Sequence, residues 1–436
     1  MQQQQKKIGL VWFRNNLRVH DNKALATSLQ NNHQTIAVYF FDPKLFTSNN
    51  FGFKKIERFR AQFLLETVAN LKKNLAKKNI TLLSYFKSPE DEMHQLCDLL
   101  KITSIYTQKE WTSEEVKTNN LIQLTLSKSV SFVEVYDQFL YTPEKVATDF
   151  TNIPNVFTAF RKKLEKTVKI DAEINIANQN ENNTINNPTE VPNLKILGFK
   201  NIEKHPNSAF PFSGGEDAAL ERLNAYFFTS KKVGFYKKTR NGLLGTDYST
   251  KFSSWLANGS ISAKTIYWKI KEYEAKHGAN DSTYWVIFEL IWRDYFKYIS
   301  LKYQNKIFKI GGILEKDYHW NNNKIAIESW INGTTKDDFV NANMIELKKT
   351  GFMSNRGRQN VASYFAKELL LDWRIGAAYF ESLLIDYDVH SNYGNWMYVA
   401  GVGNDPRDRK FNTQLQAERY DGNYKYRKRW LQPTLL

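Results

Sequence analysis

Residues 355–365 place two arginines among amide side chains at the start of an apolar helical run, in the sequence NRGRQNVASYF. Guanidinium groups offer paired donors to a phosphate or a carboxylate, and amides can hydrogen-bond the edge of a planar ring. Side chains of this kind are typical of a binding surface rather than of a core. We therefore expect residues 355–365 to take part in ligand binding.

A second polar segment, residues 386–396, has the sequence DYDVHSNYGNW and is expected to begin in a loop between helices. Asp386 and Asp388 stand two positions apart, and each carboxylate could accept a hydrogen bond from a ring N–H or a sugar hydroxyl. Helix caps and metal ligands are the alternatives for such a pair. A metal is disfavoured, because no cluster of histidines or carboxylates accompanies the two aspartates at ligand spacing.

Three hydroxyl groups and one lysine precede another apolar helical run, at Ser249, Thr250, Lys251 and Ser253. Capping oxygens, unpaired backbone amides and a cation at a helix N-terminus can together bind a phosphate. Serine and threonine clusters at helix starts are commonplace, however. From the residues alone, helix capping is the simpler interpretation.

The spacing of apolar residues by three or four predicts a helix over residues 283–303. Glu289 and Arg293 are four positions apart and flank Trp292 on a neighbouring face of this helix. An ion pair between them beside a core tryptophan is the simplest interpretation of this spacing.

Apolar runs alternate with amphipathic stretches from residue 8 to residue 137, which predicts a doubly wound α/β domain with a parallel sheet. The first strand is followed by RNNLR at residues 14–18, with no glycine-rich turn, so we expect no dinucleotide on this domain. The expected strands are 8–13, 35–41, 80–86, 104–108 and 130–136, and the expected helices include 54–78 and 89–100.

Nearly every segment from residue 214 onward is predicted to be helical, which indicates an all-α C-terminal domain. Residues 175–193 are rich in asparagine and contain Pro188 and Pro192, a composition typical of an exposed loop or linker. We therefore divide the chain into an α/β domain at 1–137, a linker at 138–213 and a helical domain at 214–436.

The chain of 436 residues contains 61 Lys and Arg against 45 Asp and Glu, a formal net charge of +16. This charge predicts attraction to a polyanion, most often nucleic acid, although it could serve solubility alone. The longest apolar runs fall short of a membrane span, so we expect a soluble protein. The start of Met1, four glutamines and two lysines fits no signal peptide, and the single Cys97 permits no internal disulfide, which favours the cytoplasm.

Segments 355–365 and 386–396 together resemble the photolyase/cryptochrome family of blue-light flavoproteins, and most closely its DASH cryptochrome branch. The resemblance extends from the VWFR sequence at residues 11–14 to the end of the chain. It implies an antenna-type α/β domain and an FAD- and DNA-binding helical domain. The implied cofactor-binding residues are Tyr236, Ser249, Thr250, Lys251, Phe252, Ser253, Arg358, Glu368, Asp386, Tyr387, Asp388 and Asn392.

Within this implied flavin site, Arg358 and Glu368 would form a salt bridge, and Asn392 would face flavin N5. Asparagine has no titratable proton, so Asn392 would stabilise an anionic reduced flavin without protonating it. A folate, 5,10-methenyltetrahydrofolate, is a candidate antenna, and Glu110 in the QKEW sequence at 108–111 would contact it.

Trp320, Trp373 and Trp396 individually look like core residues. The resemblance instead implies a path for electron transfer, with Trp320 at the surface, Trp373 in the middle and Trp396 next to the flavin. Its role would be photoreduction of FAD, the cofactor that carries the electron chemistry.

The resemblance implies light-driven repair of a cyclobutane pyrimidine dimer in DNA, a carbon–carbon lyase reaction. Trp292 would stack on the flipped dimer, and Glu289 would hydrogen-bond its base edge. The 6-4 photolyases need a pair of histidines where this chain has Asn355 and Gln359, so 6-4 repair is not expected. The implied substrate and DNA contacts are Glu289, Trp292, Arg293, Asn355, Arg356, Gln359 and Tyr398.

Gln359 and Tyr398 stand where duplex-acting enzymes usually carry methionine and tryptophan, and they match the DASH pattern. This pattern implies single-stranded or looped DNA as substrate, because extruding a base from a duplex costs a few kcal/mol. We expect a monomer. One alternative is a blue-light receptor or regulator that binds DNA without repair, which Asn392 and the short tail after Trp430 disfavour; another is a basic helical protein without a cofactor.

Overall fold

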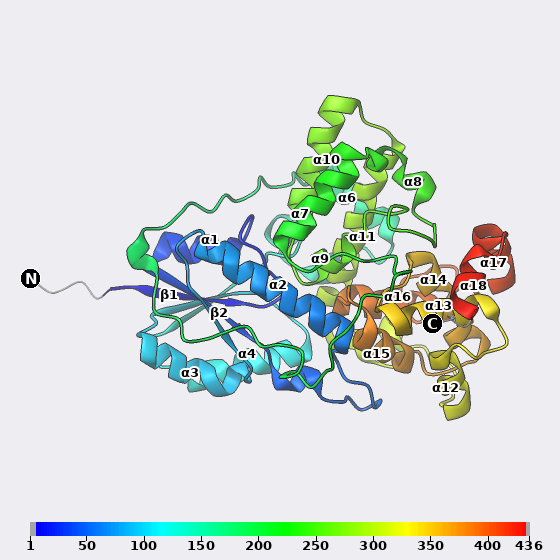
Figure 1. Ribbon diagram of the computed structural model, residues 1–436, viewed down its shortest axis with the longest axis horizontal. Helices are drawn as coiled ribbons and strands as arrows, with labels where there is room; N and C mark the ends of the chain where they lie inside the picture. The colour runs from blue at the N-terminus through cyan, green and yellow to red at the C-terminus, as the bar shows by residue number, and fades with distance from the viewer. Residues whose placement is uncertain (1–5, 433–436) are drawn as a thin grey trace, which may run out of the picture.

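The computed structural model describes residues 6–432, so the glutamines that begin the chain lie outside the described residues. Within this range, five parallel strands form one sheet in the order β3-β2-β1-β4-β5, on the left of Figure 1. Strands β2 and β3 follow on one side of β1, and β4 and β5 follow on its other side. This change of side confirms the predicted doubly wound fold. The strands are β1 (Ile8–Phe13), β2 (Gln34–Phe40), β3 (Leu82–Tyr85), β4 (Ser104–Gln108) and β5 (Ser131–Val135).

Side chains of the sheet alternate between two apolar layers, as the period of a strand requires. Val11 and Phe13 of β1 join one layer, whereas Leu10 and Trp12 join the other. Helices α1 (Lys23–Asn31) and α2 (Arg58–Ala76) cover the first layer, and α3 (Pro89–Leu100) and α4 (Ser113–Thr125) cover the second. Both faces of the sheet are therefore buried, which explains why its strands are apolar runs in the sequence.

The second half of the chain is helical, as predicted. Its longest helix, α11, begins with a capping box in which Asn280 and Thr283 hydrogen-bond each other's backbone N–H. In the described part of the chain, no helix combines the length and the apolar character that crossing a membrane requires. The helices are α7 (Glu216–Asn224), α8 (Tyr236–Thr239), α9 (Ser253–Ala257), α10 (Ala263–His277), α11 (Asp281–Tyr303), α12 (Lys324–Asn332), α13 (Asp338–Thr350), α14 (Asn355–Ser363), α15 (Trp373–Leu383), α16 (Val389–Ala400), α17 (Thr413–Asp421) and α18 (Lys425–Leu431).

The segment between the two halves is more ordered than its composition indicates. It contains α5 (Pro143–Val146) and α6 (Phe157–Thr167), and Phe157 and Phe160 of α6 lie in the core of the helical half. The prediction that residues 175–193 form an exposed loop is wrong at two positions, because Ile176 and Asn183 are buried. The Asn183 side chain accepts from Thr35 N at 2.8 Å and donates to Thr35 O, so an asparagine side chain satisfies the backbone of β2 at a residue that β3 does not pair.

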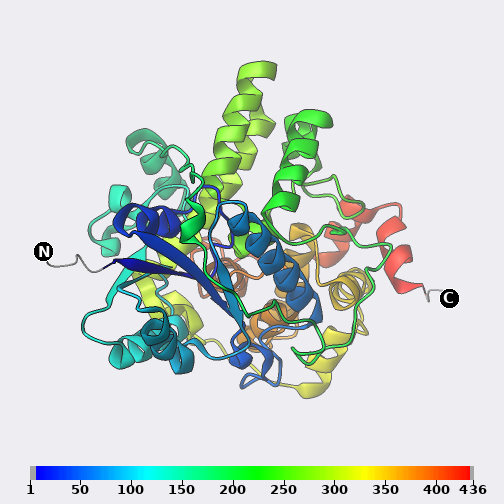
Figure 2. The ribbon, with the colours of Figure 1, turned by 60° about the vertical axis from the view of Figure 1, so that its left-hand side comes forward.

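The two halves meet through hydrogen bonds from the loop after β1 to backbone carbonyls of the loop after α9. Leu17 N donates to Asn258 O at 3.1 Å, and Arg18 donates to Gly259 O at 3.2 Å. Gly259 has a φ of +74°, and a Cβ there would meet Asn15 O at 2.0 Å, so only glycine fits. Helix α2 also reaches from the sheet to α15, as Figures 1 and 2 show. The sheet domain is thus fixed against the helices that carry the candidate site.

Candidate functional site

The loop between α15 and α16 carries a buried carboxylate, Asp386, of which only one oxygen is hydrogen-bonded by the described residues. Asp386 Oδ2 accepts from Arg358 Nη2 at 2.8 Å, whereas Asp386 Oδ1 is buried and has no hydrogen-bond partner among the described residues. A buried acceptor of this kind calls for a donor from outside the protein. The arginine-rich segment and the aspartate segment predicted from the sequence are therefore brought together.

The predicted salt bridge between Arg358 and Glu368 is wrong. Arg358 pairs with Asp386, and Glu368 pairs with Lys410 in a half-exposed position. Ten residues of helix rise about 15 Å and end on a different face, so the two side chains cannot meet along one helix. Glu368 closes a π-helical turn that follows α14, which carries it further from the buried end of Arg358.

Asp388 is committed to the protein at both oxygens. Oδ1 caps α16 by accepting from Ser391 N at 2.8 Å, and Oδ2 accepts from Lys297 Nζ of α11 at 2.6 Å. Burial opposes the ionisation of Asp388, but the Lys297 ammonium outweighs it and holds the pKa of that carboxyl well below its usual value. The helix-cap interpretation therefore holds for Asp388, and its contact with the flavin stays a prediction.

Tyr387, between the two aspartates, is held by the sheet domain. The guanidinium of Arg60, on α2, lies 4.5 Å from the centre of the Tyr387 ring and donates to Glu381 O at 2.7 Å. Sequence reasoning missed Arg60 and Lys297, because nothing near either residue marks it as a partner of a loop so distant along the chain. Arg60 lies in the first turn of α2 and Lys297 in the second half of α11, so both partners come from helices far from this loop in the sequence.

The hydroxyl-rich loop before α9 is held in place by an arginine, and its hydroxyls do not cap the helix. Arg222 of α7 donates to the carbonyl oxygens of Thr246, Ser249 and Thr250, which fixes the loop backbone. The helix α9 is only five residues long, and its N-cap residue, Phe252, has no side-chain oxygen. Capping therefore does not account for these hydroxyls.

Lys251 is the most unusual residue of this loop. It adopts a φ of +67°, is only 2% exposed, and its ammonium has no hydrogen-bond partner among residues 6–432. It lies 3.3 Å from the centre of the Tyr248 ring, and burial lowers its pKa well below the usual value. A buried amine without a hydrogen-bond partner is costly, so the loop suits an anion that would accept from Lys251.

The donor and acceptor set matches FAD. A cation at Lys251 suits a diphosphate, the open oxygen of Asp386 suits a ring imide, and the buried hydroxyls of Tyr248 and Ser254, which have no partner in the described range, suit a polyol chain. Tyr236 is buried at the start of α8, and Ser253 is exposed at the start of α9. All of these residues would line the cofactor, and Tyr248, Lys251, Ser254 and Asp386 each have a buried polar atom that it would satisfy.

Asn392 lies on α16 with its amide oriented by the neighbouring helix. Its Nδ2 donates to Ala377 O of α15 at 3.0 Å, which leaves the side-chain oxygen as the acceptor. An acceptor at this point suits a ring N–H, in agreement with the predicted position beside flavin N5. That contact stays a prediction.

Aromatic residues form a corner beside this site. The rings of Trp292 and Tyr398 lie 6.1 Å apart at 89°, and Phe157 stacks on Trp292 with a centroid distance of 3.7 Å. Phe157 was hidden from sequence reasoning, because it lies in the segment interpreted as a linker. One face of the Trp292 indole is therefore packed, and its ring orientation is fixed by the protein.

The ion pair expected between Glu289 and Arg293 is absent from the structure. Glu289 Oε1 instead pairs with Arg240 Nη2 at 2.8 Å, and burial raises the Glu289 pKa while Arg240 opposes that shift. Arg293 donates to the carbonyl oxygens of Gln138 and Leu256. Arg293 therefore ties the interdomain segment to α9, and its predicted DNA contact would compete with these bonds.

The remaining predicted DNA contacts lie on α14. Asn355 is exposed at the first position of the helix, and the Gln359 side-chain oxygen is buried with no partner among the described residues. Arg356 donates to Asn241 Oδ1 at 3.0 Å and to Gln416, and its guanidinium stacks 4.7 Å from the Tyr420 ring centre. Its partners are all neutral, so the positive charge of Arg356 is not compensated by them.

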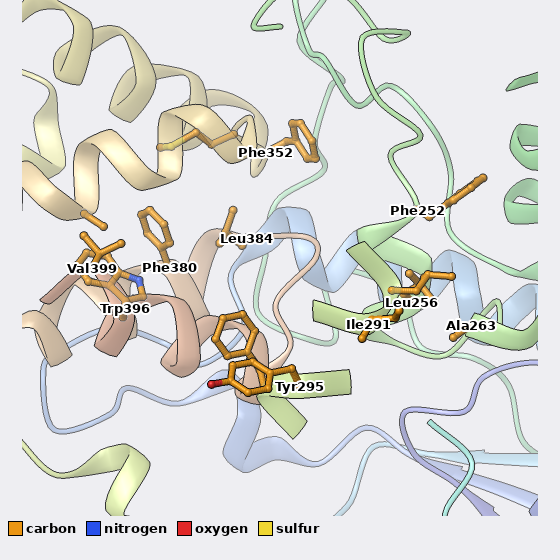
Figure 3. Close-up of a cluster of buried hydrophobic side chains, with 14 of the residues drawn as sticks. Phe252, Leu256, Ala263, Ile291, Tyr295, Phe352, Phe380, Leu384, Trp396 and Val399 are labelled. Atoms are coloured by element: carbon orange, nitrogen blue, oxygen red, sulfur yellow. The ribbon is translucent and has the colours of Figure 1, made fainter. Parts of the chain in front are cut away.

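The three predicted electron-transfer tryptophans lie along α15. A Cβ on Gly376 would come within 2.2 Å of the Trp396 indole, so Trp396 packs directly on the backbone of that helix. Trp373 stands one turn earlier, at the start of α15. A backbone bridge between Asn321 and Leu371 brings the segment of Trp320 beside this end. Figure 3 shows Trp396 next to Phe380 on the buried side.

The partial exposure of Trp320 agrees with its predicted place at the surface end of the path. Trp373 and Trp396 are almost fully buried, and Trp320 is half-buried. Trp373 Nε1 donates to Ile310 O at 2.9 Å, which fixes the middle indole. Their electron-transfer roles stay predictions.

The predicted antenna residue lies at the junction of the two halves. Glu110 is buried, accepts from Gln108 Nε2 at 2.7 Å, and its pKa is raised by burial. The adjacent Trp111 crosses to the helical half, where it stacks on His390 at 4.4 Å and donates to Ser300 Oγ. The Glu110 contact with a folate stays a prediction.

Comparisons with known proteins agree with this geometry. The family model described as the FAD binding domain of DNA photolyase matches residues 285–435, and the model described as DNA photolyase matches residues 9–179. A cryptochrome DASH of Gloeobacter violaceus is 43% identical over 427 residues, which cover 98% of this chain and 85% of that relative. A Solanum lycopersicum protein named cryptochrome DASH, chloroplastic/mitochondrial, is 40% identical and covers 98% of this chain and 77% of its own length.

The crystal structure of a Synechocystis sp. PCC6803 cryptochrome matches with a TM-score of 0.92 at 40% identity, covering 98% of this chain and 88% of that chain. The FAD-binding family model spans Arg358, Asp386 and Trp396, so FAD is the cofactor of this chain. The chain belongs to the photolyase/cryptochrome family of light-dependent FAD proteins, in its DASH cryptochrome branch.

Proposed function

We propose that this protein repairs cyclobutane pyrimidine dimers in light, with a preference for single-stranded or looped DNA. One observation carries the proposal: α11 and α16 pack together, and each of them carries one residue of the aromatic corner and one residue of the candidate flavin site. Helix α11 carries Trp292 of the aromatic corner and Lys297 of the flavin loop, and α16 carries Asn392 and Tyr398. A base seated in the aromatic corner would lie between the same helices as the flavin.

The chain's own residues would seat and orient the lesion. Trp292 and Tyr398 offer perpendicular rings to a base that has left the stack. Glu289, paired with Arg240, offers a carboxyl oxygen to a base N–H, and the unpartnered oxygen of Gln359 offers another acceptor. When bound, reduced FAD supplies the light-driven electron that opens the cyclobutane ring.

The strand preference follows from the cost of extrusion. Flipping a base pair out of a duplex costs a few kcal/mol, and a single strand or a loop avoids most of it. Trp292 already has one face packed by Phe157, so a lesion can stack on it from one side only. Stacking on one face of Trp292 therefore offsets only part of the free energy needed to flip a base out of a duplex.

Two substitutions should separate lesion recognition from phosphate binding. Stacking of a base on an aromatic ring contributes about 1–3 kcal/mol, so Trp292→Ala should reduce the preference for dimer-containing single strands by roughly 5- to 150-fold, with little change in salt dependence. Arg356→Ala should weaken binding to damaged and undamaged strands alike and make the log–log salt slope shallower by about 0.7. Fluorescence anisotropy titrations at several salt concentrations measure both effects.

The control is Arg374→Ala, which removes an arginine paired with Asp372. It should leave both the lesion preference and the salt slope unchanged. If Arg356 instead sets the lesion preference and Trp292 sets the salt slope, the lesion does not bind in the aromatic corner.

A light receptor that binds DNA without repair is the rival proposal, and the relatives' printed name, cryptochrome, favours it. Product analysis after illumination of dimer-containing oligonucleotides separates the two, because only repair restores the separate pyrimidines. The proposal also includes a monomer acting in the cytoplasm; gel filtration and cell fractionation test these points.

A further inference from the structure

Tyr318 stands at the outer end of the tryptophan path and has its own proton acceptor. Its ring lies 5.6 Å from the Trp320 ring at 83°, in an edge-on contact. Its hydroxyl donates to Asp408 Oδ2 at 2.9 Å. An oxidisable phenol in contact with an indole and hydrogen-bonded to a carboxylate has the parts needed for coupled loss of an electron and a proton.

The position of Asp408 is fixed by the surrounding structure. Its Oδ1 accepts from Lys367 Nζ at 2.6 Å, and a Cβ on Gly401, where φ is +83°, would meet that oxygen at 2.0 Å. Burial opposes ionisation, but hydrogen bonds from Lys367 and Tyr318 outweigh it and lower the Asp408 pKa. Asp408 is therefore a carboxylate at neutral pH, with one oxygen aimed at the phenol.

Trp320 itself cannot release a proton to the protein. Its indole nitrogen is buried and has no hydrogen-bond partner among the described residues. An indole radical cation formed there would keep its N–H proton and with it the full oxidising strength of the cation. The neighbouring Tyr318 phenol is the group that can reduce this radical cation.

Charges around Tyr318 favour loss of the proton together with the electron. Lys316 Nζ donates to the Tyr318 hydroxyl oxygen at 3.0 Å, and Lys367 Nζ lies 5.0 Å from the ring centre. Two ammonium groups disfavour a positive charge on the phenol ring. Transfer of the phenol proton to Asp408 removes that charge as it forms.

We propose that Tyr318 is the terminal electron donor of this protein and that Asp408 is its proton acceptor, an inference that rests on the proposed tryptophan path. The oxidant is the Trp320 radical cation left when light drives its electron inward towards the bound flavin. One electron passes from Tyr318 to Trp320, the phenol O–H bond breaks, and its proton bonds to Asp408 Oδ2. The products are neutral Trp320, a neutral tyrosyl radical and a protonated Asp408.

The test is the identity of the light-induced protein radical, read by electron paramagnetic resonance after a flash on the flavin-loaded protein. The wild type should give a tyrosyl spectrum, and its formation should slow in deuterium oxide. Tyr318→Phe should lose the tyrosyl spectrum and give a tryptophanyl radical instead. Asp408→Asn keeps the phenol but removes the base, so the tyrosyl spectrum should again be lost or strongly reduced.

Tyr393→Phe is the matched control. Tyr393 lies edge-on to Trp373 at 6.1 Å, but its hydroxyl makes no hydrogen bond to a described residue, so its removal should leave the tyrosyl spectrum intact. A tryptophanyl radical in the wild type, unchanged in Tyr318→Phe, would overturn the Tyr318 assignment and leave the tryptophan path standing. No light-induced protein radical in the wild type would overturn both.

Discussion

Replacing Trp396 with phenylalanine is expected to remove most of the blue-light reduction of bound FAD while leaving repair by chemically pre-reduced protein nearly intact. Trp396 packs on Gly376, one helical turn from Trp373, and is the proposed inner member of the path. Phenylalanine fills much of the same space but is far harder to oxidise. Loss of the oxidised-flavin absorption bands under blue light, with a thiol reductant present, measures the first activity, and dimer repair measures the second.

Trp330→Phe is the matched control for this prediction. Trp330 is also fully buried, and its ring lies 6.2 Å from that of Trp396, but its indole N–H donates to Val361 O and it is not one of the three tryptophans of the predicted path. Photoreduction should survive this change. Equal loss of photoreduction and repair in Trp396→Phe would mean that the indole is structural, and unchanged photoreduction would place the path elsewhere.

Asp386→Ala is expected to yield protein that purifies largely without FAD. The change removes the open buried acceptor and leaves Arg358 without its 2.8 Å partner. A hydrogen bond to a charged group contributes about 1.5–3 kcal/mol, so flavin affinity should fall by roughly 10- to 150-fold. The ratio of flavin to protein absorbance after gel filtration, followed by titration with FAD, gives the result.

Asp372→Ala supplies the control. Asp372, like Asp386, pairs with an arginine, but it lies at the N-cap of α15, outside the candidate flavin site. It should retain FAD. Asp386 is a cleaner target than Asp388, whose replacement would also remove the α16 cap and the Lys297 ion pair. Full flavin occupancy in Asp386→Ala would place the cofactor elsewhere.

Much of the sheet domain could be predicted because both faces of a parallel sheet are buried. Its strands are therefore apolar runs, and β1 and β4 begin and end where the sequence predicts, as does α3. Residues 175–193 were harder, because a buried asparagine such as Asn183 looks like any loop asparagine. Its burial depends on backbone groups of β2 that no local pattern reveals.

The candidate site shows the same limit. The segments that hold Arg358 and Asp386 could be found from residue types, but their pairing could not, and the family resemblance implied Glu368 instead. Partners such as Lys297 and Arg240 come from helices packed across the site. Ion pairs of this kind depend on how distant helices meet, which residue spacing along one segment does not encode.

Illuminating pre-reduced protein with an oligonucleotide that contains one thymine dimer tests the central claim most directly. The substrate is offered as a single strand, in a loop and in a duplex, and restored thymines are counted in light and in darkness. The account predicts light-dependent repair of the single strand and the loop, slower repair of the duplex, and none in the dark. Dimers that persist in a bound single strand under light, with FAD bound and reduced, would contradict it and favour a receptor.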